Sequence, residues 1–251
     1  MKIGGSVGAE TDAALDAVVA LNDGGHPLVV VHGGGPLVGE WAERLGNETR
    51  FIRGLRVTDA ETRDVALAVL GGLANGRAVA TLISRGVAAV GLTGIDGGML
   101  RAERDDAELG LVGRVTLVDS ALLEELLDAG RVPVIAPAAL AREDGEILNV
   151  NGDHAAGAIA ASLSARLLVF ITDVPGVRGK DGRVIGQLDA DRARSLVDDG
   201  TIEGGMLPKV EACLVAAAAG CRAAIVATRG VDAVERLLAG DQVGTVFEAA
   251  A

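Results

Sequence analysis

Glycine-rich turns follow three short apolar runs of this 251-residue chain, and charged side chains stand beside them. The turns are Lys2-Ile3-Gly4-Gly5-Ser6, His32-Gly33-Gly34-Gly35 and Thr172-Asp173-Val174-Pro175-Gly176-Val177. Consecutive glycines between a strand and a helix let the backbone approach a ligand and point several N–H groups at an anion. One such pair of glycines often makes only a tight turn. Two of them, with a lysine beside the first, favour a phosphate site.

Polar side chains suited to small anions occur in three further segments. Residues Asn149 to Asp153 stand where a strand meets a helix, so the two asparagines point the same way if the segment is extended, and Asp153 can cap the helix while facing the crevice. Lys209 lies near the start of an Ala-rich helix. Arg53 and Arg56 share a short loop, which suits bidentate binding of a carboxylate.

The charge balance indicates which reaction these groups serve. The chain has 23 Lys and Arg against 35 Asp and Glu, a net charge of -12, yet it gathers Lys2, Lys209 and Arg56 with the glycine turns at the ligand edge of the predicted sheet. A local positive pocket in an acidic protein favours small anionic substrates. Phosphoryl transfer needs mainly positioning and charge neutralisation, so two lysines, backbone N–H groups and Mg²⁺ would suffice without a covalent nucleophile. The P-loop and GxGxxG fingerprints are absent.

Short apolar runs alternate with helical patterns, which predicts the elements that position these residues. We expect strands over 28–32, 87–92, 132–136, 167–172, 223–227 and 245–247. We expect helices from residue 36 and over 60–85, 120–129, 153–164, 189–197, 205–219 and 231–238. Such alternation predicts an α/β fold with a mainly parallel sheet covered by helices on both faces, and ligands in open parallel sheets bind beyond the carboxyl ends of the strands.

Two stretches break this alternation. Residues 97–118 and 138–150 are polar and strand-like, and Glu143-Asp144-Gly145-Glu146 has the composition of a hairpin tip. We therefore expect small antiparallel pieces that decorate the sheet. We expect an approximate boundary between two lobes near residue 165, because the glycine-rich turns after it differ from those before it.

Composition excludes several classes of protein. Aromatic residues make up 2% of the chain, with no Tyr and one Trp, so the stacking platforms of single-strand nucleic-acid binders are missing. The apolar runs are far shorter than the roughly 20 residues of a membrane span, and no export signal follows Met1. Cys213 and Cys221 have no partner at metal spacing and are expected to be packed thiols. We therefore expect a cytoplasmic protein that binds neither nucleic acid nor membranes.

In order along the chain, these segments resemble the motifs of the amino acid kinase family. The motifs are Lys2-Ile3-Gly4-Gly5, His32-Gly33-Gly34-Gly35, Gly54-Leu55-Arg56-Val57-Thr58, Asn149-Val150-Asn151-Gly152-Asp153, Thr172-Asp173-Val174-Pro175-Gly176-Val177 and Gly205-Met206-Leu207-Pro208-Lys209. Each is weak alone, but the ordered set is specific and spans essentially the whole chain. The resemblance implies a three-layer αβα sandwich around a mainly parallel open sheet. An N-terminal lobe, 1–164, would bind the acyl amino acid and dimerise, and a C-terminal lobe, 165–251, would bind ATP.

The resemblance also implies a reaction and a role for each motif. The family members that it resembles most phosphorylate the γ-carboxylate of N-acetyl-L-glutamate in arginine biosynthesis, with ATP as co-substrate and Mg²⁺ held mainly by its phosphates. The implied catalytic residues are Lys2, Lys209 and Asp153. The implied substrate-binding residues are Gly34, Gly35, Arg56, Asn149 and Asn151. The implied ATP- and phosphate-binding residues are Gly4, Gly5, Asp173, Val174, Pro175, Gly176, Val177, Arg178, Thr201, Ile202 and Glu203.

The chain departs from the family pattern at its start, because only Met1 precedes the first lysine. The family's hexamers use an N-terminal helix before that lysine, so we expect a homodimer that arginine inhibits weakly or not at all. The sequence does not indicate a PII-type regulatory partner. His154 stands where glutamine is common, which we interpret as a local variation.

Two alternative functions remain. One is the related kinase of lysine biosynthesis that acts on aminoadipate or glutamate linked to a carrier protein, but it usually lacks the Gly-Leu-Arg-Val-Thr loop and needs a basic surface that we do not find. The other is a non-catalytic nucleotide-binding regulator on the same fold. The joint presence of Lys2, Asp153 and Lys209 argues against it, since a pure binder needs no cations at a reacting centre.

Overall fold

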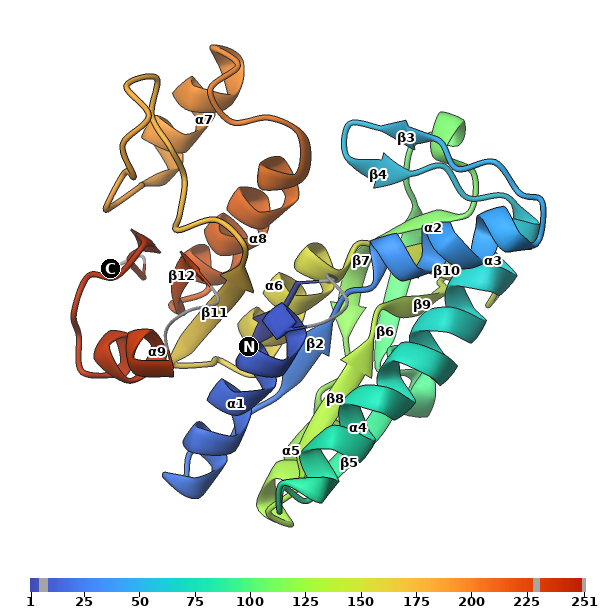
Figure 1. Ribbon diagram of the computed structural model, residues 1–251. Coiled ribbons are helices and arrows are strands. Elements are labelled where there is room, and N and C mark those ends of the chain that lie inside the picture. Colours follow the sequence, from blue (N-terminus) through green and yellow to red (C-terminus); the bar gives the residue numbers. More distant parts are fainter. Residues whose placement is uncertain (5–8, 228–230, 250–251) are drawn as a thin grey trace.

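The central sheet has seven strands, in the order β13-β12-β11-β1-β2-β8-β5 (Figure 1), in a computed structural model that describes residues 1–4, 9–227 and 231–249. The strands are β1 (Lys2–Ile3), β2 (Val30–His32), β5 (Ala89–Thr93), β8 (Val132–Ala136), β11 (Leu167–Thr172), β12 (Arg222–Ala227) and β13 (Thr245–Phe247). Every neighbouring pair is parallel except β12 and β13. The predicted mainly parallel sheet is therefore confirmed, and the carboxyl ends of β1, β2, β8 and β11 meet at one edge.

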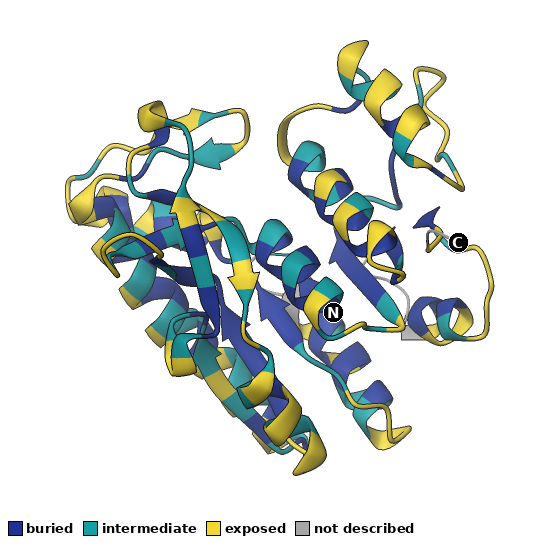
Figure 2. Cartoon of the chain, turned by 180° about the vertical axis from the view of Figure 1, so that it is seen from behind, coloured by how far each residue is buried: buried dark blue, intermediate teal, exposed yellow. Residues whose placement is uncertain are grey.

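Helices cover both faces of this sheet. They are α1 (Ala9–Asp23), α2 (Gly35–Arg44), α3 (Ala60–Leu67), α4 (Asn75–Ser84), α5 (Ala121–Asp128), α6 (Gly152–Ser162), α7 (Ala190–Asp198), α8 (Leu207–Ala218) and α9 (Val231–Leu238). Alternate strand residues enter different cores: Leu168 and Phe170 pack with α6 and α8, whereas Val169 and Ile171 pack with α1 and α9. Strands buried on both faces have little need of polar residues, and Figure 2 shows them as the buried layer between half-exposed helices. This is the expected three-layer αβα sandwich.

The two polar, strand-like stretches form a separate closed barrel, not decorations of the sheet. The barrel comprises β6 (Leu100–Arg104), β7 (Val112–Val118), β9 (Ala138–Ala141) and β10 (Ile147–Val150), in the order β10-β7-β6-β9. The hairpin predicted around residues 143–146 joins β9 to β10 and is confirmed. However, β7 pairs with β10 and β6 pairs with β9 in parallel, so the expectation of antiparallel pieces was only half right. The barrel supplies one wall of the site described below.

The helix predicted over 60–85 is continuous over Ala60–Ser84 but contains a wide turn. Between α3 and α4, residues Ala68–Ala74 adopt a π-helix, η1. By length and composition this 25-residue helix could cross a membrane, with a mean hydropathy of 1.5, whereas the sequence predicted no such segment. It packs against β5, β8 and β10, although only 28% of its most apolar stretch is buried. We therefore describe it as a sheet-covering helix.

Two smaller features, a short hairpin and the single tryptophan, lie close to the site described below. A hairpin of β3 (Phe51–Ile52) and β4 (Leu55–Arg56) turns at Arg53 and Gly54, which both have positive φ, as a two-residue primed turn requires. Trp41 lies on α2 within the cluster that α2 forms with the long helix, and the guanidinium of Arg44 lies 5.3 Å from the centre of its ring.

Candidate functional site

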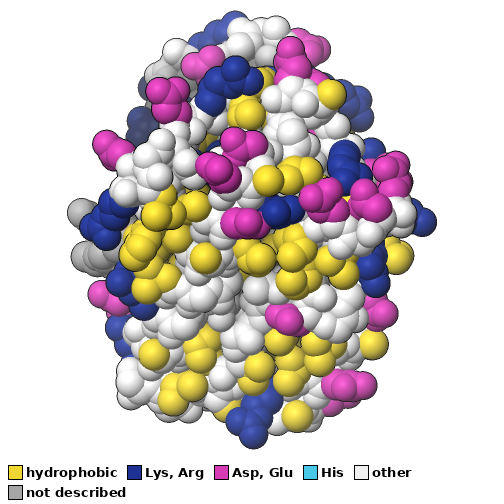
Figure 3. All heavy atoms as spheres, turned by 90° about the vertical axis from the view of Figure 1, so that its right-hand side faces the viewer, with side chains coloured by type: hydrophobic (Ala, Val, Ile, Leu, Met, Phe, Trp, Pro, Cys, Tyr) yellow, Lys and Arg dark blue, Asp and Glu magenta, His cyan; other side chains and the backbone are white. Residues whose placement is uncertain are grey.

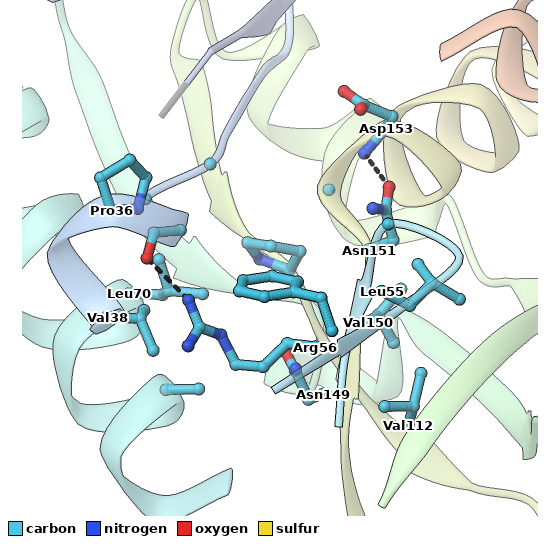
Figure 4. Close-up of a pocket in the computed structure, with 18 of the residues that line it drawn as sticks. Pro36, Val38, Leu55, Arg56, Leu70, Val112, Asn149, Val150, Asn151 and Asp153 are labelled. Atoms are coloured by element: carbon cyan, nitrogen blue, oxygen red, sulfur yellow. Dashed lines mark hydrogen bonds between the residues drawn. The ribbon is translucent and has the colours of Figure 1, made fainter. Parts of the chain in front are cut away.

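A pocket of about 210 Å³ opens where the sheet, the barrel and the β3–β4 hairpin meet (Figure 4). Many of the residues singled out from the sequence line it, from segments far apart in the chain: Lys2, Gly34, Gly35, Arg56, Asn149, Asn151 and Asp153. Apolar walls come from α2, the long helix and the barrel, through Val38, Leu70 and Val112. A small pocket with apolar walls and a few convergent polar groups suits a small, partly charged ligand.

The glycine turn between β2 and α2 forms one end of the pocket. The N–H of Gly33 donates to the carbonyl of Ile3, 3.1 Å away, which ties the turn to β1. Gly34 caps α2 without a side chain, and a Cβ at Gly34 would lie 2.5 Å from Cδ2 of Leu70. A larger residue at this position would have to displace the side chain of Leu70, and the amino end of the ten-residue α2 faces the pocket as an anion site requires.

Two ammonium groups share one buried carboxylate beside this turn. Nζ of Lys2 lies 2.6 Å from Oδ1 of Asp153, and Nζ of Lys209 lies 2.9 Å from Oδ2. Lys209 also donates to the carbonyl of Gly205, 3.1 Å away. The side chains of Lys2 and Asp153 are only 8% and 6% exposed, so their interaction is weakly screened by water. The structure thus brings together the three residues expected to be catalytic.

Burial and charge act on the pKa values of this cluster in opposite directions. Burial lowers the pKa of Lys2; the carboxylate of Asp153 opposes this change, and Lys209 adds to it. Burial would raise the pKa of Asp153, but the two ammonium groups outweigh it and hold that pKa below its usual value. Asp153 is therefore ionised at neutral pH. One carboxylate cannot neutralise two ammonium groups, so the cluster keeps a net positive charge that an anion can use.

Arg56 lies on the pocket wall opposite the Lys2–Asp153 pair, and three contacts hold its guanidinium in place. Its guanidinium donates to the carbonyl of Gly35 at 2.8 Å and to Oγ1 of Thr49 at 3.0 Å, and stacks 4.9 Å from the ring centre of Phe51. Figure 4 shows it directed across the pocket toward α2. The other arginine of this loop, Arg53, instead pairs with Asp106. Arg53 therefore does not line the pocket, and carboxylate binding by this loop stays a prediction for Arg56.

Asn149 and Asn151 follow the barrel strand β10 into α6. Nδ2 of Asn149 donates to Oγ1 of the buried Thr58, 3.0 Å away. Oδ1 of Asn151 accepts from the N–H groups of Asp153 and His154 at 2.8 and 3.2 Å, so Asn151 is the N-cap of α6. The sequence interpretation gave that role to Asp153. The correction has a physical cause: the two lysines hold the Asp153 carboxylate away from the helix end.

The residues predicted to bind nucleotide lie outside this pocket. Asp173 and Arg178 are exposed, Val174 and Pro175 are half-buried, and Gly176 is buried. The N–H of Val177 donates to Oγ1 of Thr245 at 2.8 Å. Further along, Thr201 is half-buried, Ile202 is in the core and Glu203 is exposed.

The first glycine turn is only partly described. The N–H of Gly4 donates to the carbonyl of Ile171 at 3.1 Å, so it is engaged in the sheet, although we expected it to face phosphates. Gly5 lies outside the described residues. The tip of the β3–β4 hairpin lies close to the short helix η4 (Gly204–Met206), since a Cβ at Gly54 would lie 3.0 Å from the carbonyl oxygen of Gly204.

The part of the chain that the structure describes has no group of three or more His, Cys, Asp or Glu side chains that could hold a metal ion. Cys213 and Cys221 are buried, and burial raises the pKa of both thiols.

The sequence interpretation missed two groups that shape the site. Phe51, which is 56% exposed, supports Arg56, and no periodic signal marks it. Asn75 on the long helix contacts His32 beside the glycine turn. An asparagine that directly follows the uninterrupted apolar run 65–74 is the one sign that could have drawn attention to it.

Comparison with known proteins connects this geometry to a family. The model of the amino acid kinase family matches residues 1–227. A protein of Dehalococcoides mccartyi named acetylglutamate kinase is 43% identical over 98% of this chain and 93% of its own length. One of the same name from Methanopyrus kandleri is 46% identical over 90% of this chain and 93% of its own. The crystal structure of smu.665 from Streptococcus mutans UA159 superposes with a TM-score of 0.82 at 27% identity, covering 99% of this chain and 97% of that one.

Proposed function

The chain belongs to the amino acid kinase family, and on this premise we propose that it phosphorylates N-acetyl-L-glutamate with ATP, as an acetylglutamate kinase. The product is N-acetylglutamyl 5-phosphate, an intermediate of arginine biosynthesis. Curated relatives of that name at 43% and 46% identity support the activity. The observation that carries the proposal is the cluster of Lys2, Asp153 and Lys209 at the end of a pocket lined by glycine N–H groups and Arg56.

The chemistry fits a site without a general base. The γ-carboxylate of the substrate is ionised at neutral pH, because free Glu has a pKa of about 4.3, and it can attack the γ-phosphorus directly. A bond forms between a carboxylate oxygen and phosphorus, the bond to the β-bridging oxygen breaks, and ADP leaves. Both reactants are anions, so the protein must mainly neutralise charge and hold the groups in line. Lys2 and Lys209 supply that charge, and Asp153 holds both ammonium groups in place.

We assign the acyl amino acid to the pocket. Arg56 binds its α-carboxylate, and Asn149 and Asn151 bind its carboxylate or acetamido groups, while Gly34 and Gly35 present backbone N–H groups to the substrate and the transferring phosphoryl. The apolar wall of Val38, Leu70 and Val112 suits the methylene and methyl groups. On this proposal, the substrate binds in the lobe formed by residues 1–164.

ATP then lies on the lobe formed by residues 165–251 and arrives as its Mg²⁺ complex. Asp173 to Arg178 and Thr201 to Glu203 line the nucleotide, Gly4 lies beside its phosphates, and Lys209 reaches the γ-phosphoryl group. Because the chain has few aromatic residues, aliphatic side chains and backbone hold the adenine. The reaction belongs in the cytoplasm, where both substrates are made.

Hydroxylamine trapping tests the activity directly. The purified protein is incubated with N-acetyl-L-glutamate, ATP and Mg²⁺ in hydroxylamine, and the acyl phosphate is measured as its hydroxamate. We expect product from N-acetylglutamate and little from glutamate, aspartate or aminoadipate, with none when EDTA removes Mg²⁺. Equal or faster turnover of aminoadipate or free glutamate would refute the proposed substrate, and no turnover with any acceptor would favour the non-catalytic alternative.

We also propose a homodimer formed by the edge strand β5 and the exposed face of the long helix. That face carries the small residues Ala68, Gly72, Gly76 and Ala80 and the 56%-exposed Ile83. Figure 3 shows hydrophobic side chains spread over this side of the molecule with few charges between them. Light scattering should give the mass of a dimer, and Ile83→Asp should shift it toward the monomer. A hexameric mass with inhibition at submillimolar arginine would contradict this assembly.

A further inference from the structure

A buried polar contact joins the long helix to the glycine turn, outside the residues assigned above. Asn75, which is 5% exposed, lies directly after the π-helical turn of η1. Its Nδ2 lies 3.1 Å from Nε2 of His32, 2.8 Å from the carbonyl of Val134 and 3.3 Å from that of Leu92. On the other side of the ring, Nδ1 of His32 lies 2.9 Å from the carbonyl of Gly33. The long helix thereby reaches the backbone of the turn through a single imidazole.

These partners fix the protonation state of His32. Carbonyl oxygens only accept, so the atom of Asn75 that faces Val134 must be the amide nitrogen. Its two hydrogens serve Val134 and His32, and the carbonyl of Leu92 is the longest of its three contacts. Nε2 of His32 must then accept from Asn75, and Nδ1 must carry the proton that it donates to Gly33. Burial lowers the pKa of His32, the Gly33 bond opposes that change, and Lys2 adds to it; the lowered pKa favours the neutral ring.

The bond to Gly33 determines where the next N–H group points. In a planar trans peptide the carbonyl and the following N–H point in opposite directions. Holding the Gly33 carbonyl against His32 therefore turns the Gly34 N–H to the other side of the peptide plane. Gly33 and Gly34 both line the pocket, so a rotation of this one peptide would change which group meets the ligand. Glycine allows such rotation readily, which makes an external restraint useful.

The fold makes room for Asn75 in two ways. Asn75 follows the buried Leu70 by five positions, a step that a π turn can bring to one face of the helix and a regular α-helix cannot. In the edge strand β5, Gly91 leaves space for the amide: a Cβ there would lie 2.2 Å from Oδ1 of Asn75. A glycine inside a strand marks a close approach of this kind. The π turn and the glycine in β5 therefore both make room for the side chain of Asn75.

We propose that Asn75 is a positioning residue for phosphoryl transfer: it selects the Nδ1-protonated form of His32, which holds the Gly33–Gly34 peptide with its N–H toward the transferring group. This proposal rests on the proposed kinase function. Asn75 touches neither substrate, so its effect reaches the reaction only through His32. Because preorganised N–H donors act on the transition state, its loss should reduce kcat more than it raises either KM.

The kinetic test compares variants that keep or remove the donor to Gly33. Asn75→Leu should lower kcat by about 10- to 100-fold and change either KM less than about threefold, since removing an oxyanion donor outright costs about 100- to 1000-fold. His32→Leu should behave alike, whereas His32→Asn, whose amide can still donate to Gly33, should recover most of the loss. In the His32→Asn background, Asn75→Leu should add little. The exposed Arg77, on the same helix, gives a matched control in Arg77→Ala.

A second measurement separates this proposal from the kinase function. The chain has three histidines, so ¹⁵N NMR of the imidazoles can be assigned by single replacement. We expect His32 to be Nδ1-protonated from pH 6 to 8 in the wild type and to lose that preference in Gly91→Ala, which displaces Asn75 without touching the pocket. An Nε2-protonated or titrating His32 would overturn the proposal even if the kinase activity stands. So would wild-type kcat in Asn75→Leu, or equal activities for His32→Asn and His32→Leu.

Discussion

Replacing Asp153 by Asn would leave the Lys2 ammonium buried without its counter-ion. Releasing the Lys2 proton relieves this strain, so it sets an upper limit on the loss of stability that the uncompensated Lys2 charge can cause. The ordinary pKa of Lys2 is 10.5, and each pH unit corresponds to about 1.36 kcal/mol. At pH 7, which is 3.5 units below 10.5, the cost of releasing the proton is about 5 kcal/mol, and at pH 9 it falls to about 2 kcal/mol. The measured cost of breaking a buried ion pair, about 3–5 kcal/mol, lies at this limit.

The pH dependence follows with a definite sign. In Asp153→Asn the folded pKa of Lys2 is depressed below the unfolded value, so the unfolded chain binds more protons and stability rises with pH up to about 10.5. Urea unfolding of wild type and variant should therefore differ by about 3–5 kcal/mol at pH 7 and by about 3 kcal/mol less at pH 9. The exposed pair of Asp191 and Arg194 supplies the control: Asp191→Asn should cost under about 0.5 kcal/mol at both pH values.

The same variant should lose catalysis, because Lys2 becomes a neutral amine and Lys209 loses its anchor. We expect the hydroxamate assay to show kcat reduced by about 100- to 1000-fold. A loss of stability that is the same at pH 7 and pH 9 would refute the idea that an uncompensated Lys2 charge is its cause. Near-normal turnover would refute the role of the cluster.

Three further predictions concern single contacts. Lys209→Ala should lower kcat by about 100-fold or more with a modest change in ATP affinity, measured by ADP release; unchanged turnover would exclude Lys209 from the reaction. Arg56→Lys keeps the charge but not the bidentate geometry, so the KM for N-acetylglutamate should rise about tenfold with a smaller change in kcat, and an unchanged KM would remove Arg56 from the substrate site. Gly157→Ala would place a Cβ 2.9 Å from both Cβ and the carbonyl oxygen of Ala212, so denaturant unfolding should show a loss of about 1–3 kcal/mol; an equally stable variant would mean that α6 and α8 can separate freely.

The elements that the sequence predicted best are those with strong local signals. The strands over 132–136, 167–172 and 245–247 have the predicted bounds, because continuous apolar runs bounded by turns identify strands buried on both faces. The barrel was not foreseen. Its parallel pairs join segments that are distant in the sequence, and no local pattern records that pairing.

Helix details failed where tertiary contacts outweighed local preference. Helix α1, Ala9–Asp23, was absent from the predicted elements although its composition suits a helix. Asn151 and Asp153 are both good capping residues, and only the two lysines, brought in from distant segments, decide which one caps. The π turn before Asn75 likewise follows from packing against the sheet, since nothing in Ala68–Ala74 marks it.

The site was predicted more fully on the substrate side than on the nucleotide side. Glycine turns, asparagines and lysines at strand ends converge because the carboxyl ends of parallel strands share one edge. The segments predicted to bind nucleotide mix buried and exposed residues, and their contacts with ATP stay a prediction. The apolar walls of the pocket could not be identified in advance, because Val38 and Leu70 have the same pattern as any core residue.

The position of Trp41 has a spectroscopic consequence. It is the only tryptophan, and the chain has no tyrosine. Fluorescence excited near 295 nm therefore comes from the single indole ring of Trp41 on α2, the helix that begins at the glycine turn. The ring is half-buried against the cluster around Leu70. Its emission therefore reports the environment of α2 without background from elsewhere. A titration with the acyl amino acid, followed in a stopped-flow instrument, would resolve ligand entry from turnover without a label.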